Sequence, residues 1–549
     1  MKRSNGFMLL LHKALYRLRV ILRRLRDNWE IERLAIRLGK HFPPAKQLDP
    51  VILFIASSGT TDFTYNGAFN LLAAWGLRLA GVPVIHFACQ AGMLHCVLGT
   101  NRNKPYDPPP CRECIRHSQA KLKGADVHWF SFEQDESLAE ALQDLNLIEL
   151  AAFEYHHTFN GLPSPLPLGA LVTPGLRWIL RRLHLQDDEP TRYLYRDYIL
   201  SAWNVARRFA ALLEQSHPQA VIVFNGQFYP EAVAAWVTRK RNVRVVTHEV
   251  GLQPFSAFFT EGEATAYPIH IPADFELNHE QNARLDGYLE KRFQGQFSMA
   301  GVRFWQHIKG LDEAFIEKSA QFKQIVPVFT NVIFDTSQPH ANTVFPDMFN
   351  WLELIVDLMR NHPETLFVIR AHPDETRPGK VSQETVRNWV AEHNVTSYPN
   401  VVFIAPGEYL SSYELIQRSK FVMVYNSTIG LEAAIMGAPV LCGGKARFTQ
   451  YPIVFFPQSA KDFRQKAEEF LEAGRIDVPA EFRRNARRFL YYQLFRTSLP
   501  FDPFLRTSSQ PSLTRFRYFP WEQLLPENSP AIAAIVQGIL DQGDFLLES

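Results

Sequence analysis

Short apolar runs and stretches of helical periodicity alternate along the first half of the chain. Each apolar run is bounded by small or polar residues, as expected of a strand buried on both faces of a parallel sheet. The runs predict strands at 51–56, 84–88, 220–224 and 243–248, with helices at 66–80, 190–216 and 230–240. Strand–helix–strand units of this length imply right-handed crossovers. The segment 160–178 is rich in Pro, Gly and Leu and is expected to be a loop.

A second alternating block follows a more polar, mostly helical stretch at 270–320. Its predicted strands are 326–330, 366–369, 401–404, 421–425 and 439–441, and its predicted helices are 347–361, 382–393, 411–418, 429–436 and 460–473. This block therefore predicts a second Rossmann-like domain.

The predicted fold is α/β, with two Rossmann-like domains. The 549 residues exceed the roughly 250–300 at which a single core stops growing. The predicted segments are a basic amphipathic helix at 1–44, a Rossmann-like domain at 45–270, a helical bridge at 271–322, a second Rossmann-like domain at 323–480, and a helical tail at 481–549 that packs across the domains.

Composition excludes several classes of protein. A net charge of +2 gives no support to nucleic-acid binding. Five cysteines in so long a chain do not make a secreted disulfide framework. No apolar run reaches the ~18–20 residues of a membrane span, and the N-terminus lacks the pattern of a secretory signal. A cytoplasmic protein is the expectation.

The N-terminal segment 7–39 combines leucines at helical spacing with many basic side chains. The leucines are Leu11, Leu15, Leu18, Leu22 and Leu25, and the cations are Lys13, Arg17, Arg19, Arg23, Arg24 and Arg26. One interpretation is peripheral attachment to an anionic inner-membrane surface. The other is an ordinary helix packed on the first domain with solvated arginines.

Two strand ends of the second domain carry groups suited to phosphate. The strand 366–369 runs into Arg370-Ala371-His372-Pro373, where a guanidinium and an imidazole share one side and Pro373 ends the strand. In a parallel sheet, ligands sit beyond the carboxyl ends of the strands. The alternative is a solvent-exposed strand end with an incidental histidine.

The strand 421–425 runs into a predicted helix start that offers hydroxyls and backbone N–H groups. Ser427 and Thr428 stand where an N-cap belongs, and such a helix start favours anions. Gly430 would let a ligand approach the backbone, and Glu432, one turn on, could accept two ribose hydroxyls. The alternative is a plain cap with a surface glutamate. Lys445 and Arg447 would add positive charge near the phosphates, and Asn331 and Asp335 would lie at the same carboxyl edge of the sheet.

Cysteines cluster in the first domain. They are Cys89, Cys96, Cys111 and Cys114, of which the last two form a C-x-x-C pair. Four thiolates are a common structural zinc set, although the gap between Cys89 and Cys96 exceeds the usual spacing. A packed or redox-active thiol pair remains the alternative.

The assembled motifs resemble the capsule polysaccharide biosynthesis family of bacterial glycosyltransferases. The segments that carry the resemblance are Thr330-Asn331-Val332, Arg370-Ala371-His372-Pro373, Ser412-Tyr413-Glu414-Leu415-Ile416, Tyr425-Asn426-Ser427-Thr428-Ile429-Gly430-Leu431-Glu432 and Gly437-Ala438-Pro439-Val440. In the first domain, Phe224-Asn225-Gly226 and Thr247-His248-Glu249-Val250-Gly251 look like the same broad group.

The resemblance implies a GT-B architecture, two Rossmann-like domains facing a cleft, and sugar transfer that requires no metal cofactor. By residue-wise carry-over, His372 would contact the donor's phosphate, often that of a cytidine nucleotide, and would act in catalysis by assisting its departure. Ser427 and Thr428 would bind phosphate oxygens, and Glu432 the ribose. The other donor-binding candidates come from their places in the sequence and are Arg370, Pro373, Asn331, Gly430 and Lys445. The domain at 45–270 would bind the acceptor.

The expected function is transfer of a sugar from a nucleotide-linked donor, for which the resemblance implies a CMP-linked sugar, to a capsule-type polysaccharide or glycolipid. A base must deprotonate the acceptor hydroxyl, and Glu249 and Asp62, which ends the segment 57–62 after the first strand, are the candidates. The alternatives are an inactive GT-B scaffold in an assembly complex, a polyol-phosphate transferase and a sugar-nucleotide epimerase.

Overall fold

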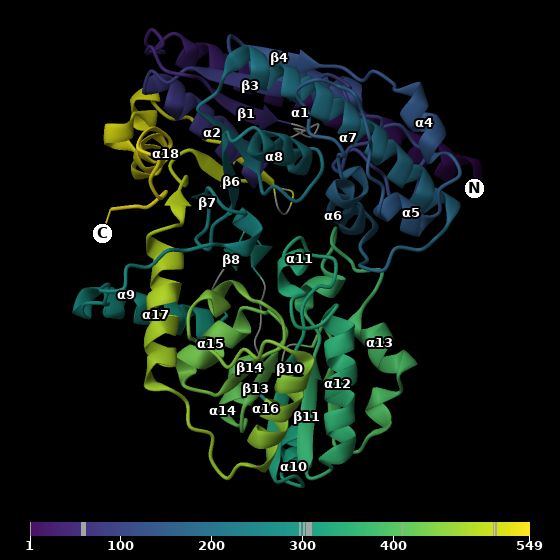
Figure 1. Ribbon diagram of the computed structural model, residues 1–549, viewed down its shortest axis with the longest axis vertical. Helices are drawn as coiled ribbons and strands as arrows, with labels where there is room; N and C mark the ends of the chain where they lie inside the picture. The colour runs from purple at the N-terminus through teal and green to yellow at the C-terminus, as the bar shows by residue number, and fades with distance from the viewer. Residues whose placement is uncertain are drawn as a thin grey trace. The chain divides into compact units, whose positions relative to one another are not determined.

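The chain divides into two units, neither of which is contiguous in sequence. The computed structural model describes residues 2–55, 62–295, 298–299, 302–303, 310–408, 410–508, 510 and 513–548. Unit 1 comprises Met1–Thr173, Asp187–Glu261 and Leu499–Ser549, and unit 2 comprises Pro174–Gln186 and Gly262–Ser498 (Figure 1). The sequence pattern gives no sign that the segment Leu499–Ser549 belongs with the first unit.

Unit 1 is built on a seven-stranded sheet of order β15-β7-β6-β5-β1-β3-β4. Its parallel strands are β1 (Val51–Ile55), β3 (Val84–Cys89), β4 (Asp126–Phe130), β5 (Ala220–Phe224) and β6 (Arg244–Val250), and its antiparallel edge consists of β7 (Ser256–Thr260) and β15 (Leu499–Pro500). The central strands are buried on both faces, which explains their continuous apolar sequences.

Helices cover the sheet of unit 1. They are α2 (Tyr65–Leu79), α3 (Cys111–Lys121), α4 (Glu136–Leu142), α5 (Leu147–Ala151), α6 (Leu168–Leu180, divided between the units), α7 (Glu189–Ser216), α8 (Glu231–Lys240) and α18 (Pro530–Leu540). The C-terminal α18 packs on α2, where a Cβ at Gly76 would lie 2.6 Å from the Ile532 side chain. The absent side chain is what permits this close approach. A small sheet joins β2 (Phe63–Thr64), β16 (Leu505–Thr507) and β17 (Leu513–Phe516).

The N-terminal helix α1 (Lys2–Gly39) packs on unit 1 by one face of its C-terminal half. Ile31, Ala35 and Leu38 are buried there and belong to the core of the unit. They recur at intervals of four and three residues, the spacing of one helical face. Among the described residues, no helix is both long enough and apolar enough to cross a membrane.

Unit 2 is built on a five-stranded parallel sheet of order β12-β11-β10-β13-β14. The strands are β10 (Gln324–Phe329), β11 (Thr365–Arg370), β12 (Val401–Ile404), β13 (Val422–Val424) and β14 (Val440–Cys442). The chain adds β11 and β12 on one side of β10, then crosses to add β13 and β14 on the other. The strand order therefore reverses next to β10, and such a switch point is where open α/β sheets bind ligands.

The other elements of unit 2 are mostly helices. They are α9 (His279–Phe293), α10 (Glu313–Ser319), α11 (Gln338–Ala341), α12 (Met348–Asn361), α13 (Val386–Glu392), α14 (Ser412–Gln417), α15 (Ile429–Met436), α16 (Ala460–Glu472) and α17 (Ala480–Phe495), with a short hairpin of β8 (Ser298–Met299) and β9 (Val302–Arg303).

The two parallel sheets confirm the predicted GT-B-like α/β class. The predicted loop at 160–178 is wrong, because Leu168–Leu180 forms α6. Leu168, Val172, Leu176 and Ile179 recur at helical spacing and are buried, and this burial outweighs the helix-breaking tendency of Pro174.

Candidate functional site

The loops that follow three adjacent strands of unit 2 are joined by hydrogen bonds at the switch point. The Thr330 hydroxyl, just after β10, donates to the Arg370 carbonyl at the end of β11 (3.0 Å). The Asn331 amide donates to the Asn426 side chain, which follows β13 (2.7 Å). The strand ends that carry the predicted phosphate-binding motifs are thus tied into one edge, and Asn331 serves as a bridge within it.

His372 lies half-buried directly after β11, with its ring orientation fixed by the backbone. Its Nδ1 accepts a hydrogen bond from the Asp374 N–H (3.2 Å), which leaves the proton of the neutral ring on Nε2. Burial lowers the pKa of His372, while the nearby carboxylates of Asp374 and Asp335 act in the opposite direction. At neutral pH the ring can therefore donate one hydrogen bond to an anionic oxygen. Pro373 begins the single helical turn that holds this geometry.

Basic side chains that were not predicted from the sequence lie around His372. Arg377 and Lys380 both oppose protonation of the ring, and Arg377 pairs with Asp374 (3.3 Å). Arg181 donates to the Gly379 carbonyl (3.0 Å) and also acts on Lys380. Burial lowers the pKa of Lys380, so the ammonium stands where an added negative charge would stabilise it. The sequence signal for these residues is weak, because two of them lie in a loop and Arg181 is far from His372 in the sequence.

Arg370 lies beneath this edge rather than on it. Its side chain is buried, and the guanidinium donates to the Glu408 carbonyl (3.3 Å). Burial lowers the pKa of Arg370 to about 10, which still leaves it charged at neutral pH. This burial favours a supporting role over the predicted direct contact with the donor, and strand alternation alone does not reveal how deep a side chain lies.

Ser427 and Thr428 stand at the start of α15, as predicted. Thr428 is the N-cap, but its side chain makes no capping hydrogen bond, and both hydroxyl residues are half-buried. Gly430 does not face open space, because a Cβ there would lie 3.0 Å from the side chains of Val424 and Phe448. Its predicted role in admitting a ligand is corrected to close packing of α15. Lys445 is exposed.

Glu432 forms a buried ion pair. One carboxylate oxygen lies 2.6 Å from Arg292 of α9, and the other accepts from the Tyr413 hydroxyl of α14 (2.5 Å). Burial is the largest single influence on the pKa of Arg292 and lowers it, but Glu432, Tyr288 and Tyr413 together raise it, and the net shift is upward. Because both oxygens are engaged, the arrangement favours a structural role over the predicted contact with a ribose.

In unit 1, Glu249 is a partly exposed carboxylate at the carboxyl end of β6. Its two oxygens accept from the Asn66 amide of α2 (3.0 Å) and from the Asn225 amide after β5 (3.3 Å). The Val250 N–H donates to it as well (2.8 Å). Donors from three elements therefore orient a carboxylate that solvent can still reach, as a general base requires.

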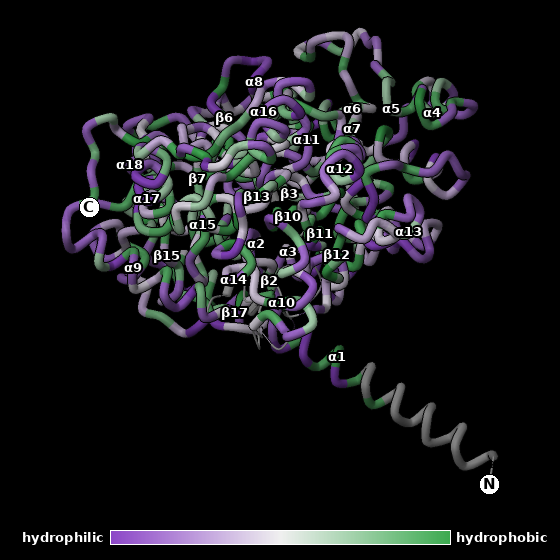
Figure 2. The backbone as a smooth tube through the Cα atoms, turned by 90° about the horizontal axis from the view of Figure 1, so that it is seen from below, coloured by the Kyte–Doolittle hydropathy of each residue, from purple (hydrophilic) through white to green (hydrophobic). Residues whose placement is uncertain are grey.

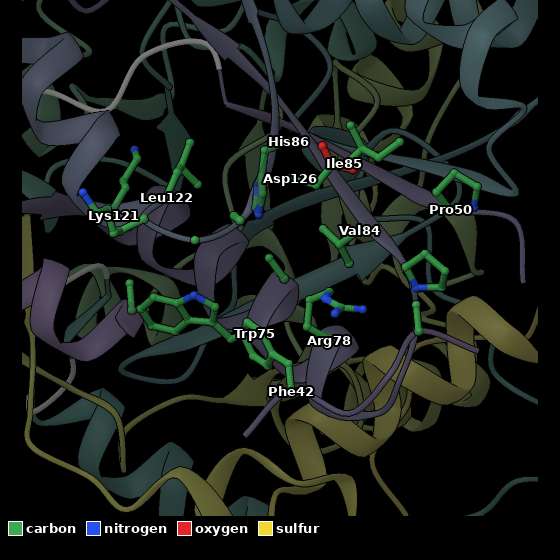
Figure 3. A pocket seen from close by; sticks show the side chains of 17 residues that line it. Phe42, Pro50, Trp75, Arg78, Val84, Ile85, His86, Lys121, Leu122 and Asp126 are labelled. Carbon is green, nitrogen blue, oxygen red and sulfur yellow. The ribbon is translucent and has the colours of Figure 1, made fainter. Parts of the chain in front are cut away.

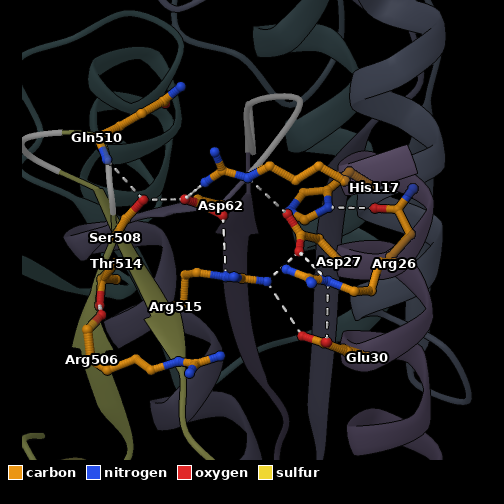
Figure 4. Close-up of polar contacts among 12 residues, drawn as sticks. Arg26, Asp27, Glu30, Asp62, His117, Arg506, Ser508, Gln510, Thr514 and Arg515 are labelled. Atoms are coloured by element: carbon orange, nitrogen blue, oxygen red, sulfur yellow. Dashed lines mark hydrogen bonds and ion pairs between the residues drawn. The ribbon is translucent and has the colours of Figure 1, made fainter. Parts of the chain in front are cut away.

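Asp62, the other predicted base, is locked in an ion-pair network (Figure 4). Its side chain is fully buried and pairs with Arg23 of α1 (2.5 Å) and with Arg515 of β17 (3.4 Å). Ser508 also donates to it. A base must exchange its proton with an acceptor, and this carboxylate is inaccessible, so the prediction is corrected to a structural role. Residues 57–61 lie outside the described part of the chain.

The four clustered cysteines lie close enough for their charges to interact. Cys89 ends β3, and Cys111 and Cys114 lie in the first turn of α3. Burial raises the pKa of Cys89 to about 12, and the pKa values of Cys96 and Cys111 are raised for the same reason. Among the residues that the structure describes, no three or more His, Cys, Asp or Glu are arranged to hold a metal ion. The zinc set stays a prediction.

A pocket of about 410 Å³ lies in unit 1 beside the amino ends of the strands (Figure 3). Its lining includes Ala35, Trp75, Arg78, His86, Lys121 and Asp126. Burial, and secondarily Lys121, lowers the pKa of His86 to about 3, so this imidazole is neutral. The pocket is at the opposite edge of the sheet from Glu249, away from the carboxyl ends where such sheets bind ligands.

Residues 300–471 match the family model described as "Capsule polysaccharide biosynthesis protein". This part of the chain is therefore similar to the capsule polysaccharide biosynthesis family. The resemblance predicted from the motifs is thus confirmed, and the family segment contains His372, Ser427, Thr428 and Glu432.

The chain is also similar to a curated protein and to solved structures. Protein FixF of Sinorhizobium fredii is 26% identical over 242 residues, which are 43% of this chain and 50% of that protein, so the match spans about half of that relative's length. Two Thermosulfurimonas dismutans structures are named KpsC, beta Kdo 2,4 transferase (11% identity, TM-score 0.34, 52% of this chain and 82% of that one) and KpsC, beta Kdo 2,7 transferase (16%, 0.31, 60% and 89%). At these TM-scores, neither carries an argument about this chain.

Proposed function

We propose that the protein transfers a sugar from a nucleotide-linked donor, bound by unit 2, to a polysaccharide or glycolipid acceptor. The observation that carries this proposal is His372 at the switch point, with its Nε2 proton available and Arg377 and Lys380 beside it. Such a set suits a phosphate whose negative charge grows as the sugar leaves. The match of residues 300–471 to the capsule polysaccharide biosynthesis family model supports the same class of reaction.

In the proposed reaction, the bond between the anomeric carbon and the donor's phosphate oxygen breaks, and the electron pair stays on that oxygen. His372 donates a hydrogen bond to the departing phosphate, Lys380 supplies positive charge, and the hydroxyls of Ser427 and Thr428 bind the other phosphate oxygens. An acceptor hydroxyl forms the new bond to the anomeric carbon and gives its proton to a base, for which Glu249 is the candidate. No step requires a metal ion, so a chelator is expected to leave the rate unchanged.

A panel of CMP, CDP, UDP and GDP tested by calorimetry addresses the donor site. By the resemblance, we expect a cytidine nucleotide to bind most tightly. His372→Ala should weaken binding about tenfold or more, because it removes a hydrogen bond to a charged group. The matched control is His279→Ala, since His279 is an exposed histidine of the same unit, at the start of α9.

Turnover is then measured with the nucleotide that binds, linked to candidate sugars that include Kdo, the sugar in the names of the two transferases above. Transfer to a glycolipid or polysaccharide supports the proposal, and an epimerised donor with no transfer contradicts it. If the folded protein binds none of the four nucleotides, the scaffold alternative is favoured.

A further inference from the structure

The N-terminal helix α1 has two opposite faces that are both apolar. One contains Ile31, Ala35 and Leu38 and is buried in unit 1. The other is exposed, and we call it the α1 stripe: Leu15, Leu18, Leu22, Leu25 and Trp29, which are between 45% and 60% exposed. Intervals of three and four residues place these five side chains along one face of the helix. A continuous row of large apolar side chains in water marks an interaction surface.

Positive charge borders the α1 stripe. No Asp or Glu precedes Asp27 in the sequence, whereas eight Lys and Arg do. Further along the helix, the Arg33 guanidinium lies over the Trp29 ring (4.4 Å) and Arg37 lies over the ring of Tyr518 (4.6 Å), which is 85% exposed. Tryptophan and tyrosine beside arginine are typical of the boundary between water and lipid.

We propose that α1 lies along an anionic membrane surface, with the α1 stripe among the acyl-chain ends and the flanking arginines on the lipid phosphates. An amphipathic helix with Leu and Trp on one face and basic residues beside it binds in this way without spanning the bilayer. This inference goes beyond the proposed sugar transfer and does not depend on it.

Charge decides between a membrane and a second copy of the chain as the occupant. The spacing of the α1 stripe would also suit a two-stranded coiled coil, but such pairs need opposite charges beside the seam. Before Asp27 the charged residues of α1 are all basic, so two copies paired along this part would repel each other. Anionic lipid supplies the missing negative charge, at about 1 kcal/mol, or fivefold in affinity, per arginine near the surface.

The helix is fixed firmly enough to hold unit 1 at such a surface. Arg23 and Asp27 of α1 form ion pairs with Asp62 and Arg515 of the unit (Figure 4). Figure 2 shows hydrophobic and hydrophilic positions alternating along the coloured part of α1, and the exposure of Leu22, Leu25 and Trp29 means that the other described residues leave the α1 stripe uncovered.

The test is flotation of the full-length protein with vesicles of phosphatidylcholine alone and of phosphatidylcholine mixed with phosphatidylglycerol. We expect binding to the anionic vesicles that weakens at high salt. Leu22→Asp/Leu25→Asp should reduce the affinity for the vesicles at least tenfold, and Arg19→Gln/Arg33→Gln about 25-fold at low salt, at about fivefold for each arginine.

The matched control is Ile148→Asp, since Ile148 is an equally apolar side chain of unit 1, on α5, that is 80% exposed and lies outside the α1 stripe. It should bind vesicles like the wild type, and the melting temperatures of all variants should be unchanged, because every altered side chain is on the surface. Equal binding to neutral vesicles, or full binding by Leu22→Asp/Leu25→Asp, overturns the proposal. So does a dimer in light scattering that this variant converts to a monomer. None of these measurements uses transferase activity, so their failure is distinct from a failure of the proposed function.

Discussion

Replacing Glu432 by Gln separates a structural role of this carboxylate from a role in binding the donor's ribose. The change keeps the size and shape of the side chain but removes its charge. Arg292 would then lie buried without its counter-ion, since its partner oxygen is 2.6 Å away and both side chains are almost inaccessible. The Tyr413 hydroxyl would keep an acceptor only if the new amide presented its oxygen on that side.

The expected loss of stability follows from burial of the pair. Removing one partner of a buried ion pair costs about 3–5 kcal/mol, because the remaining charge is desolvated. In a unit of about 250 residues, 1 kcal/mol shifts the melting temperature by about 2–4 °C. We therefore expect the melting temperature of unit 2, measured by calorimetry, to fall by roughly 10 °C. Arg292→Met/Glu432→Leu should recover most of this loss, because apolar groups of similar volume can replace such a pair.

Nucleotide binding, measured below the melting transition, completes the test. If the role is structural, folded Glu432→Gln binds the nucleotide panel as the wild type does. A variant that melts at the wild-type temperature and loses nucleotide binding about tenfold would refute the structural assignment and restore the predicted ribose contact. Tyr413→Phe provides the control, since it removes only one neutral partner of the carboxylate.

Two further predictions concern charge at other positions. The His184 ring donates hydrogen bonds to Asp347 and to Glu384, and these raise its pKa to about 10. The stabilisation of unit 2 by His184 is therefore complete below the unfolded pKa of about 6.5 and is lost as the pH rises through 10. The melting-temperature difference between wild type and His184→Gln should thus shrink between pH 7 and 10. At pH 7 the stabilisation is about 1 kcal/mol or less, because the His184 side chain is more than half exposed. A difference that stays constant over this pH range would contradict the prediction. Glu249→Gln should lower kcat at least 100-fold with nucleotide affinity unchanged, whereas a change confined to KM would argue against a base.

The fold was predictable because strands buried on both faces of a parallel sheet appear in the sequence as short apolar runs. Nine of the twelve strands described in the two large sheets coincide with predicted apolar runs, whereas β4, β7 and β15 of unit 1 were not predicted. The assignment of 499–549 to unit 1 was not predictable, because it depends on contacts between distant parts of the sequence, such as Ile532 against Gly76. The helix α6 was missed because Pro and Gly are read as breakers unless burial is known.

The sequence predicted the types of residue at the candidate site but not how deeply each side chain is buried. Asp62, Arg370 and Glu432 have the right chemistry for their predicted roles, yet each is buried against a partner distant in sequence. His372 and Glu249 are partly accessible to solvent, so His372 remains a candidate for contact with the donor phosphate and Glu249 a candidate for the base. Accessibility depends on which other elements cover a strand end, and no local pattern records that.

The charge around His372 leads to a dependence of nucleotide affinity on pH. Burial keeps the pKa of the free ring below its usual value of about 6.5, and a phosphate beside Nε2 would raise it again by stabilising the imidazolium. A group whose pKa rises on binding takes up a proton, so affinity should increase as the pH falls from 7 towards 5. The nucleotide's own phosphate also titrates, near pH 6. The His372→Ala variant keeps the pH dependence of affinity that is due to the phosphate and should lack only the pH dependence that is due to the imidazole. Calorimetry in two buffers of different ionisation enthalpy measures the proton uptake directly. Equal uptake by wild type and His372→Ala would mean that the imidazole does not meet the phosphate.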